Sequence, residues 1–165
     1  LAEVADREIV VVGWGEDVVA RDINYLPRFR GAAERAASRH GVPLRWCGVP
    51  RGAAATEAGL DEILGSHRPG LLLASSVTEA MNALYRRGLR PGVDLDVVAL
   101  ATHAEAEAFP TPLTAVSTRP RDVSRQATDW LFTLLDDPSA PGEIRLVPAE
   151  LTRRGSVRPA RDTRG

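Results

Sequence analysis

The stretch LLLASSVTEAMNALYRRGLRPGVDLDVVALATHAEAEAFPTPLTAVST, residues 71–118, decides the fold of this chain. Its apolar runs predict buried strands at 71–74, 96–101 and 113–117. A helix is predicted between the first and second of these strands, so strand and helix alternate. This order favours an α/β fold with a doubly wound parallel sheet and helices on both faces. In such sheets, ligands lie beyond the carboxyl ends of the strands.

Polar residues and glycines mark the boundaries of the predicted helices. Ser76 and Glu79, three residues apart, predict a capping box where the helix after strand 71–74 begins, and Gly88 predicts its end. Thr56 is the predicted N-cap of an earlier helix. The other elements follow from the same signals: strands at 9–12 and 44–47, one or two closing strands at 144–147 and 149–153, and helices beginning near Pro27 and Pro120.

The composition indicates a folded protein. Of the 165 residues, 44% are hydrophobic and 26% are charged with both signs mixed, as in one ordinary domain or two small lobes. No apolar run approaches the ~20 residues that cross a bilayer, and nothing resembles a signal peptide, so we expect a cytoplasmic protein. The formal net charge of −1 gives no attraction for phosphate backbones, so the chain by itself is not expected to bind nucleic acid.

The sequence lacks the residue patterns of catalytic and cofactor-binding sites. It contains no glycine-rich phosphate loop, no G-x-S-x-G turn and no two histidines at metal-ligand spacing. Its single cysteine, Cys47, lies in an apolar stretch, which favours a buried strand residue over a nucleophile. We therefore predict no enzymatic activity, no cofactor and no metal site.

Residues that directly follow the predicted strands are candidates for ligand contacts. Trp14 follows the first strand, where its indole would stack on a sugar or a heterocycle; packing against Tyr25 is an equally good interpretation. Ser75 and Ser76 follow the third strand. Ser76 as a helix cap needs no ligand, whereas Ser75 is free to face one. Thr102 follows the fourth strand at the same edge of the sheet.

Five segments of the chain resemble the effector-binding domain of the lactose-repressor/galactose-repressor (LacI/GalR) transcription regulators. ADREIVVVGWG is similar to the family's entry to the carboxyl-terminal lobe, and YLPRFRGAAERAASRHGVPL to the helix that follows it. The best matches are ALYRRGLRPGVDLDVVAL and PLTAVSTRPRDVSRQATDWLFTLLDDP. VPAELTRRGSVRPAR is similar to the family's closing segment. The order and spacing of these segments together make the resemblance specific.

The resemblance implies a periplasmic-binding-protein-like type I fold, of which this chain holds mainly the carboxyl-terminal lobe. Residues 1–118 would form that lobe, and 119–153 a helix and closing strands that belong partly to the other lobe. From their composition, rich in proline, glycine and arginine, residues 154–165 are expected to form a flexible, solvated tail. A small molecule, a carbohydrate or a related compound, would control operator binding allosterically through a helix-turn-helix domain absent from this chain. The family also implies a homodimer and no membrane partner.

The resemblance assigns ligand-contact positions, at which this chain departs from the family. The family's sugar-gripping arginine falls on Tyr25, and its Asn-Asp or Ser-Asp pair is replaced by Ser75 and Ser76. Its two aspartates fall on Ala101 and Thr102. Because these changes remove the charge-assisted hydrogen bonds that anchor sugar hydroxyls, the pocket differs from that of a standard aldohexose sensor.

Arg21 and Asp22 complete the predicted site. They lie in the loop before the first long helix, at positions that the family often uses for ligand contacts, and a surface ion pair is the alternative interpretation. The predicted ligand-binding residues are Trp14, Arg21, Asp22, Tyr25, Ser75, Ser76 and Thr102.

Two other classes of protein are alternatives to a regulator. A periplasmic solute-binding protein of an ABC transporter shares the fold, and an upstream secretion or lipoprotein signal would favour it. An enzyme with a flavodoxin-like fold would carry a bound cofactor. The segment PLTAVSTRPRDVSRQATDWLFTLL fits the regulator pattern better than the solute-binding one.

Overall fold

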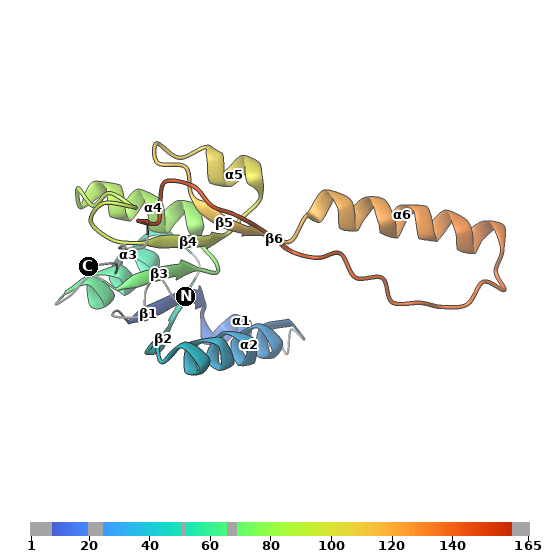
Figure 1. Cartoon of the computed structure of the whole chain (residues 1–165), viewed down its shortest axis with the longest axis horizontal. Coiled ribbons are helices and arrows are strands. Elements are labelled where there is room, and N and C mark those ends of the chain that lie inside the picture. The colour runs from blue at the N-terminus through green and yellow to red at the C-terminus, as the bar shows by residue number, and fades with distance from the viewer. Residues whose placement is uncertain (1–7, 20–24, 51, 66–68, 160–165) are drawn as a thin grey trace, which may run out of the picture.

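The computed structural model describes residues 8–19, 25–50, 52–65 and 69–159. These residues form one six-stranded sheet (Figure 1). Its strands are β1 (Ile9–Trp14), β2 (Leu44–Val49), β3 (Gly70–Leu73), β4 (Val97–Leu100), β5 (Thr114–Ser117) and β6 (Glu150–Thr152). The order is β2-β1-β3-β4-β5-β6, with β1 to β5 parallel and β6 antiparallel to β5. The prediction of an α/β fold with a mainly parallel sheet is confirmed.

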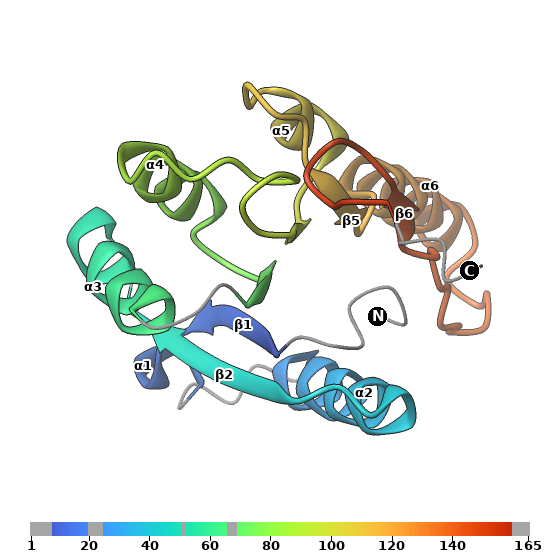
Figure 2. The ribbon, with the colours of Figure 1, turned by 60° about the vertical axis from the view of Figure 1, so that its left-hand side comes forward.

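Helices cover both faces of this sheet. The helices of the described residues are α1 (Glu16–Val19), α2 (Tyr25–His40), α3 (Ala53–Leu64), α4 (Val77–Arg86), α5 (His103–Glu107) and α6 (Pro120–Asp136), the last of which projects away from the sheet. α3, α4 and α5 pack on one face, and α2 lies on the opposite face beside β1 and β2 (Figure 2). Among the described helices, none combines the length and the apolar character needed to cross a membrane.

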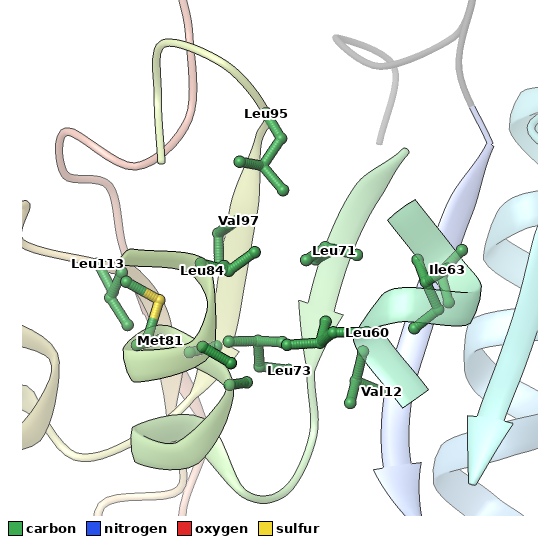
Figure 3. Close-up of a cluster of buried hydrophobic side chains, with 14 of the residues drawn as sticks. Val12, Leu60, Ile63, Leu71, Leu73, Met81, Leu84, Leu95, Val97 and Leu113 are labelled. Carbon is green, nitrogen blue, oxygen red and sulfur yellow. The ribbon is translucent and has the colours of Figure 1, made fainter. Parts of the chain in front are cut away.

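The main core lies between the sheet and the layer of α3 and α4. Alternate residues of β1 to β5 point to this layer, because side chains along a strand alternate between its two faces. Leu60 of α3 and Met81 and Leu84 of α4 are fully buried against them (Figure 3). The strand and loop residues that meet these helices include Val10, Val12, Leu71, Leu73, Leu95, Val97 and Leu113.

Residues 154–158, here called the C-terminal strap, pack against β4 and β5. Ser156 is fully buried, and its hydroxyl accepts a hydrogen bond from the Thr114 backbone N–H at 2.8 Å and donates one to the Val97 carbonyl at 2.6 Å. The Ser156 carbonyl accepts the Val97 N–H at 2.8 Å. The strap therefore completes backbone hydrogen bonding at the start of these two strands.

A charged clamp and a tight backbone contact fix the strap further. Arg158 donates to Asp96 from its backbone N–H at 2.9 Å and from its guanidinium at 2.9 and 2.6 Å. Gly92 has a φ of +78°, and a Cβ there would lie 1.9 Å from the Gly155 carbonyl oxygen, so only glycine fits. The prediction of a solvated tail beginning at residue 154 is thus wrong for residues 154–158; residues 160–165 lie outside the described part.

α6 and residues 137–149 form an arm that projects from the β5–β6 side of the sheet (Figure 1). None of the residues of α6 is buried. The guanidinium carbon of Arg145 lies 4.2 Å from the centroid of the Trp130 ring. This cation–π contact holds residues 137–149 beside the helix. Of the one or two closing strands predicted at 144–147 and 149–153, the second is formed as β6, whereas residues 144–147 form no strand. The exposed apolar side chains of the arm are Val123, Leu131, Phe132, Leu135, Ile144 and Leu146.

Candidate ligand-binding site

A cavity of about 420 Å³ opens at the carboxyl ends of the parallel strands. Its volume lies within the range of roughly 300–1,000 Å³ that is usual for small-molecule sites. The wall is built from the connections β1–α1, β2–α3, β3–α4 and β4–α5, as expected for the carboxyl edge of a parallel sheet. The residues on which its chemistry depends are Trp14, Gly52, Ser75, Ser76, Glu79 and Glu105.

Trp14 supplies the aromatic surface of the cavity. It is the last residue of β1. Its ring packs edge to face against the rings of Tyr25 and Phe29, with ring centroids 5.6 and 6.1 Å apart, respectively. These two contacts, both from α2, fix the indole in one orientation. Tyr25 is 52% exposed and is not among the residues that line the cavity. Packing of Trp14 against Tyr25, one of the two predicted interpretations, is therefore present, and Trp14 lines the cavity as well.

Ser75 and Ser76 both line the cavity at the turn from β3 into α4. Ser76 precedes the helix but has φ 51° and ψ 39°, a left-handed conformation, and its side chain makes no capping hydrogen bond. An N-cap needs an extended backbone to aim its oxygen at the first helical N–H groups. The predicted capping box of Ser76 and Glu79 is therefore wrong, and the first turn of α4 has no side-chain cap.

α3 also begins at the cavity without a side-chain cap. Its N-cap residue is Gly52, which lines the cavity. Thr56, the predicted cap, is instead buried inside the helix, where its hydroxyl donates to the Gly52 carbonyl at 2.9 Å. The first N–H groups of a helix have no intrahelical partners and carry about half a positive charge in total. Two helix N-termini thus offer hydrogen-bond donors at this site.

α5, in contrast, is capped by its own residues. The Thr102 hydroxyl accepts from the Glu105 N–H at 3.3 Å, and Glu105 Oε2 accepts from the Thr102 N–H at 2.9 Å and hydroxyl at 2.8 Å. The backbone hydrogen bond, followed by the hydroxyl one, lowers the pKa of Glu105. Thr102 does not line the cavity but orients Glu105, which does.

The charged groups that line the described part of the cavity are acidic. Glu79 is half-buried in the first turn of α4 and forms no hydrogen bond or ion pair with any described residue. Glu105 is the second carboxylate, and no described arginine or histidine lines the wall. Arg21 and Asp22, two of the predicted ligand contacts, lie outside the described residues. The site therefore combines one aromatic ring, free N–H donors and two carboxylates.

These groups suit binding rather than bond chemistry. Burial, followed by the Glu62 carboxylate, raises the pKa of the Cys47 thiol, which disfavours the reactive thiolate. His103 does not line the cavity. Its Nδ1 lies 3.3 Å from the Arg154 guanidinium nitrogen Nη2 and 3.5 Å from the Thr152 hydroxyl oxygen. Within the described ranges, no three His, Cys, Asp or Glu side chains are arranged to hold a metal ion.

The sequence matches the family model described as "periplasmic binding protein-like domain" over residues 1–157. This chain belongs to that family. The cavity lies at the carboxyl edge of a parallel sheet, where α/β folds bind their ligands. No curated protein matches the sequence.

Solved structures of LacI family regulators share the fold of this periplasmic binding protein-like chain. A regulator from Bifidobacterium animalis subsp. lactis is 19% identical with a TM-score of 0.78, over 96% of this chain and 59% of that protein. A regulator from Enterococcus faecium with bound ribose is 16% identical with a TM-score of 0.74, over 93% of this chain and 57% of that protein. The Lac repressor bound to ONPG is 23% identical with a TM-score of 0.70, over 92% of this chain and 46% of that protein. The chain thus spans less than two thirds of each of these proteins.

Three lining residues, Gly52, Glu79 and Glu105, were missed as site residues by the analysis of the sequence. Glu79 was predicted to take part in a helix cap, and Gly52 was given no role. Glu105 stands three residues after Thr102, the spacing of a capping box, and this signal could have placed it at the carboxyl edge of β4. The predicted residues Trp14, Ser75 and Ser76 do line the cavity of this periplasmic binding protein-like domain.

Proposed function

We propose that this chain is the effector-binding part of a bacterial LacI-type transcription regulator and that its effector is a small, sugar-like molecule. The single observation that carries the proposal is the cavity at the carboxyl edge of the sheet, with the fixed indole of Trp14 on its wall. The fold is that of LacI family regulators, of which one from Enterococcus faecium holds ribose. An aromatic face and hydrogen-bond donors together suit a ring that bears hydroxyl groups.

In the proposed mechanism, the cavity is one half of a clamp. A ligand that binds Trp14, Ser75 and the first turn of α4 also contacts a second lobe and draws the two lobes together. Such hinge closure changes the geometry of a DNA-binding head elsewhere in the protein. Because coupling between two sites is reciprocal, the effector changes DNA affinity by the same factor by which DNA changes effector affinity. The protein would act in the cytoplasm, where its operator is.

The arm fits this arrangement. Residues 119–153 are proposed to belong partly to the second lobe, against which α6 would bury its apolar stripe. Leu131 and Phe132 are 54% and 61% exposed, and side chains of this size gain about 1.5–3 kcal/mol each when buried. We also propose a homodimer, since a two-fold protein matches a palindromic operator.

Operator binding by the intact protein tests the proposal. Fluorescence anisotropy with labelled DNA from upstream of its own gene is measured with and without members of a sugar panel. We expect one sugar to change the DNA affinity by about 5-fold or more, the lower range of allosteric coupling. Trp14→Ala should remove the response to the sugar and keep the affinity for DNA alone, whereas Trp14→Phe should retain part of the response.

Two outcomes oppose the proposal. An intact protein that binds a sugar but no DNA would favour the solute-binding alternative, which shares the fold. A full sugar response in Trp14→Ala would place the effector site elsewhere in the protein.

A further inference from the structure

The charges on the cavity wall narrow the chemical class of the effector. We propose that the ligand carries an ammonium group on a polyhydroxylated ring, as an amino sugar does, and that Glu79 binds this ammonium. The inference rests on the proposed function, since it concerns the ligand of the same cavity. It does not depend on which operator the protein binds.

Glu79 is the residue on which the inference depends. Glu79 lines the cavity from the first turn of α4, and its carboxylate forms no hydrogen bond or ion pair with any described residue. The left-handed turn at Ser76 leaves the helix without the capping box that would otherwise occupy Glu79. A half-buried carboxylate without a partner is best satisfied by a cation that donates hydrogen bonds, because such bonds are about twice as strong as neutral ones.

The balance of charge at the cavity opposes an anionic ligand. The uncapped N-termini of α3 and α4 each contribute about half a positive charge. Glu79 and Glu105 each contribute a full negative charge, and the hydrogen bonds from Thr102 keep Glu105 ionised. Over the described residues that line the cavity, these contributions sum to roughly one negative charge. Phosphorylated or carboxylated sugars are therefore disfavoured at this wall.

The remaining groups of the cavity match the rest of such a ligand. The first N–H groups of α3 and α4 are free to donate to ring hydroxyls, which accept as well as donate. The indole of Trp14 attracts both the C–H face of a sugar ring and a nearby cation. A neutral polyol would use the indole and the N–H groups but would leave Glu79 with weaker, uncharged donors.

Calorimetric titration of the intact protein with matched sugar pairs tests the inference. The probes are glucosamine, galactosamine and mannosamine, each beside its parent hexose and its N-acetyl derivative, with glucose 6-phosphate as the anionic probe. A slightly acidic buffer keeps the amines protonated. We expect at least one amine to bind about tenfold tighter than its parent hexose, the gain of one charge-assisted hydrogen bond. Acetylation, which removes the charge, should abolish the gain.

Glu79→Gln should remove the preference for the amine and leave affinity for the parent hexose within about threefold, because the amide keeps the size of the side chain. Glu62→Gln is the matched control, since Glu62 lies exposed on α3 and away from the cavity. Circular dichroism establishes that both variants are folded. A parent hexose that binds as tightly as its amine overturns this inference and leaves the proposed function standing. Tighter binding of glucose 6-phosphate, or no binding of any amine, overturns it as well.

Discussion

Replacing Ser156 with alanine tests whether the C-terminal strap is a structural part of the domain. In the structure the Ser156 hydroxyl is fully buried and joins two parallel strands, since it accepts the Thr114 N–H and donates to the Val97 carbonyl. Alanine keeps the backbone hydrogen bond from the Val97 N–H to residue 156 but leaves the other two groups without their partner. Water has no ready access to them there.

The magnitude follows from the two orphaned groups. Each buried donor or acceptor left unsatisfied costs about 1–3 kcal/mol, so the loss is about 3 kcal/mol once partial relaxation is included. That is a large share of the roughly 5–15 kcal/mol by which domains are usually stable. For a chain of this size it corresponds to a fall in Tm of roughly 6–12 °C. Urea unfolding followed by circular dichroism measures the free energy, and a thermal melt measures Tm.

Ser124→Ala is the matched control, because Ser124 is exposed on α6. It should change stability by less than about 0.5 kcal/mol. A Ser156→Ala variant as stable as the control would refute the structural role of the strap. In that case the sequence-based expectation of a solvated tail from residue 154 would be the better description. An equal loss in both variants would point to a general effect of the substitution.

Two further predictions concern the core and the helix cap. Leu84→Ala removes a fully buried side chain between α4 and the sheet and should lower the free energy of unfolding, measured by chemical denaturation, by about 2–5 kcal/mol. Val93 is 55% exposed in a loop, and Val93→Ala should lower it by under about 0.5 kcal/mol. Similar losses in the two variants would contradict the packing in Figure 3. Thr102→Val should lower stability by about 1 kcal/mol at neutral pH, because it removes the cap of α5. The pKa of Glu105 is lowered on folding, so the contribution of the cap is present above the ordinary glutamate range and is lost as the pH falls through the lowered pKa. Thr102→Val loses the hydroxyl bonds but keeps the backbone N–H that donates to Glu105, so its stability difference from wild type should narrow in acid without vanishing, and a constant difference across that range would disprove the coupling.

The fold was largely predictable because its strands are short apolar runs between clear breakers. All five predicted parallel strands are present, and their ends shift by only a few residues. The run at 144–147 has the same apolar character but forms no strand, since a strand also needs a neighbouring edge with which to pair. Ile144 and Leu146 are 91% and 85% exposed for the same reason. Local sequence does not specify which partner lies beside a segment.

The strap was missed for a related reason. Arg154 and Arg158 stand in a segment rich in proline, glycine and arginine, a composition typical of solvated tails. Their role depends on Asp96 and on the Thr114 hydroxyl, which lie about 40 to 60 residues earlier in the chain. Pairings of this range follow from the topology of the sheet, in which the chain returns past β5 after the arm. Composition alone does not contain that information.

Two sequence signals with the same spacing have opposite outcomes at the cavity. The difference determines which groups on the cavity wall are left to bind a ligand. Ser76-x-x-Glu79 and Thr102-x-x-Glu105 both have capping-box spacing. Thr102 is extended at φ −68° and ψ 161° and forms the box, whereas Ser76 is left-handed and does not. Ser76 follows the turn out of β3, where the Ala74 and Ser75 N–H groups both donate to the Val12 carbonyl.

Because the capping box at Ser76 is not formed, the wall of the cavity keeps polar groups that can bind a ligand. Had Ser76 been extended, its hydroxyl and Glu79 would have satisfied each other's backbone donors, and the first turn of α4 would offer nothing. With Ser76 left-handed, no side chain caps the N–H groups of that turn, and Glu79, which lines the cavity, has no partner among the described residues. Leaving both without partners is unfavourable unless water or a ligand meets them. Donors and an acceptor therefore stand ready within one helical turn, an arrangement complementary to adjacent hydroxyl and ammonium groups on a single ring.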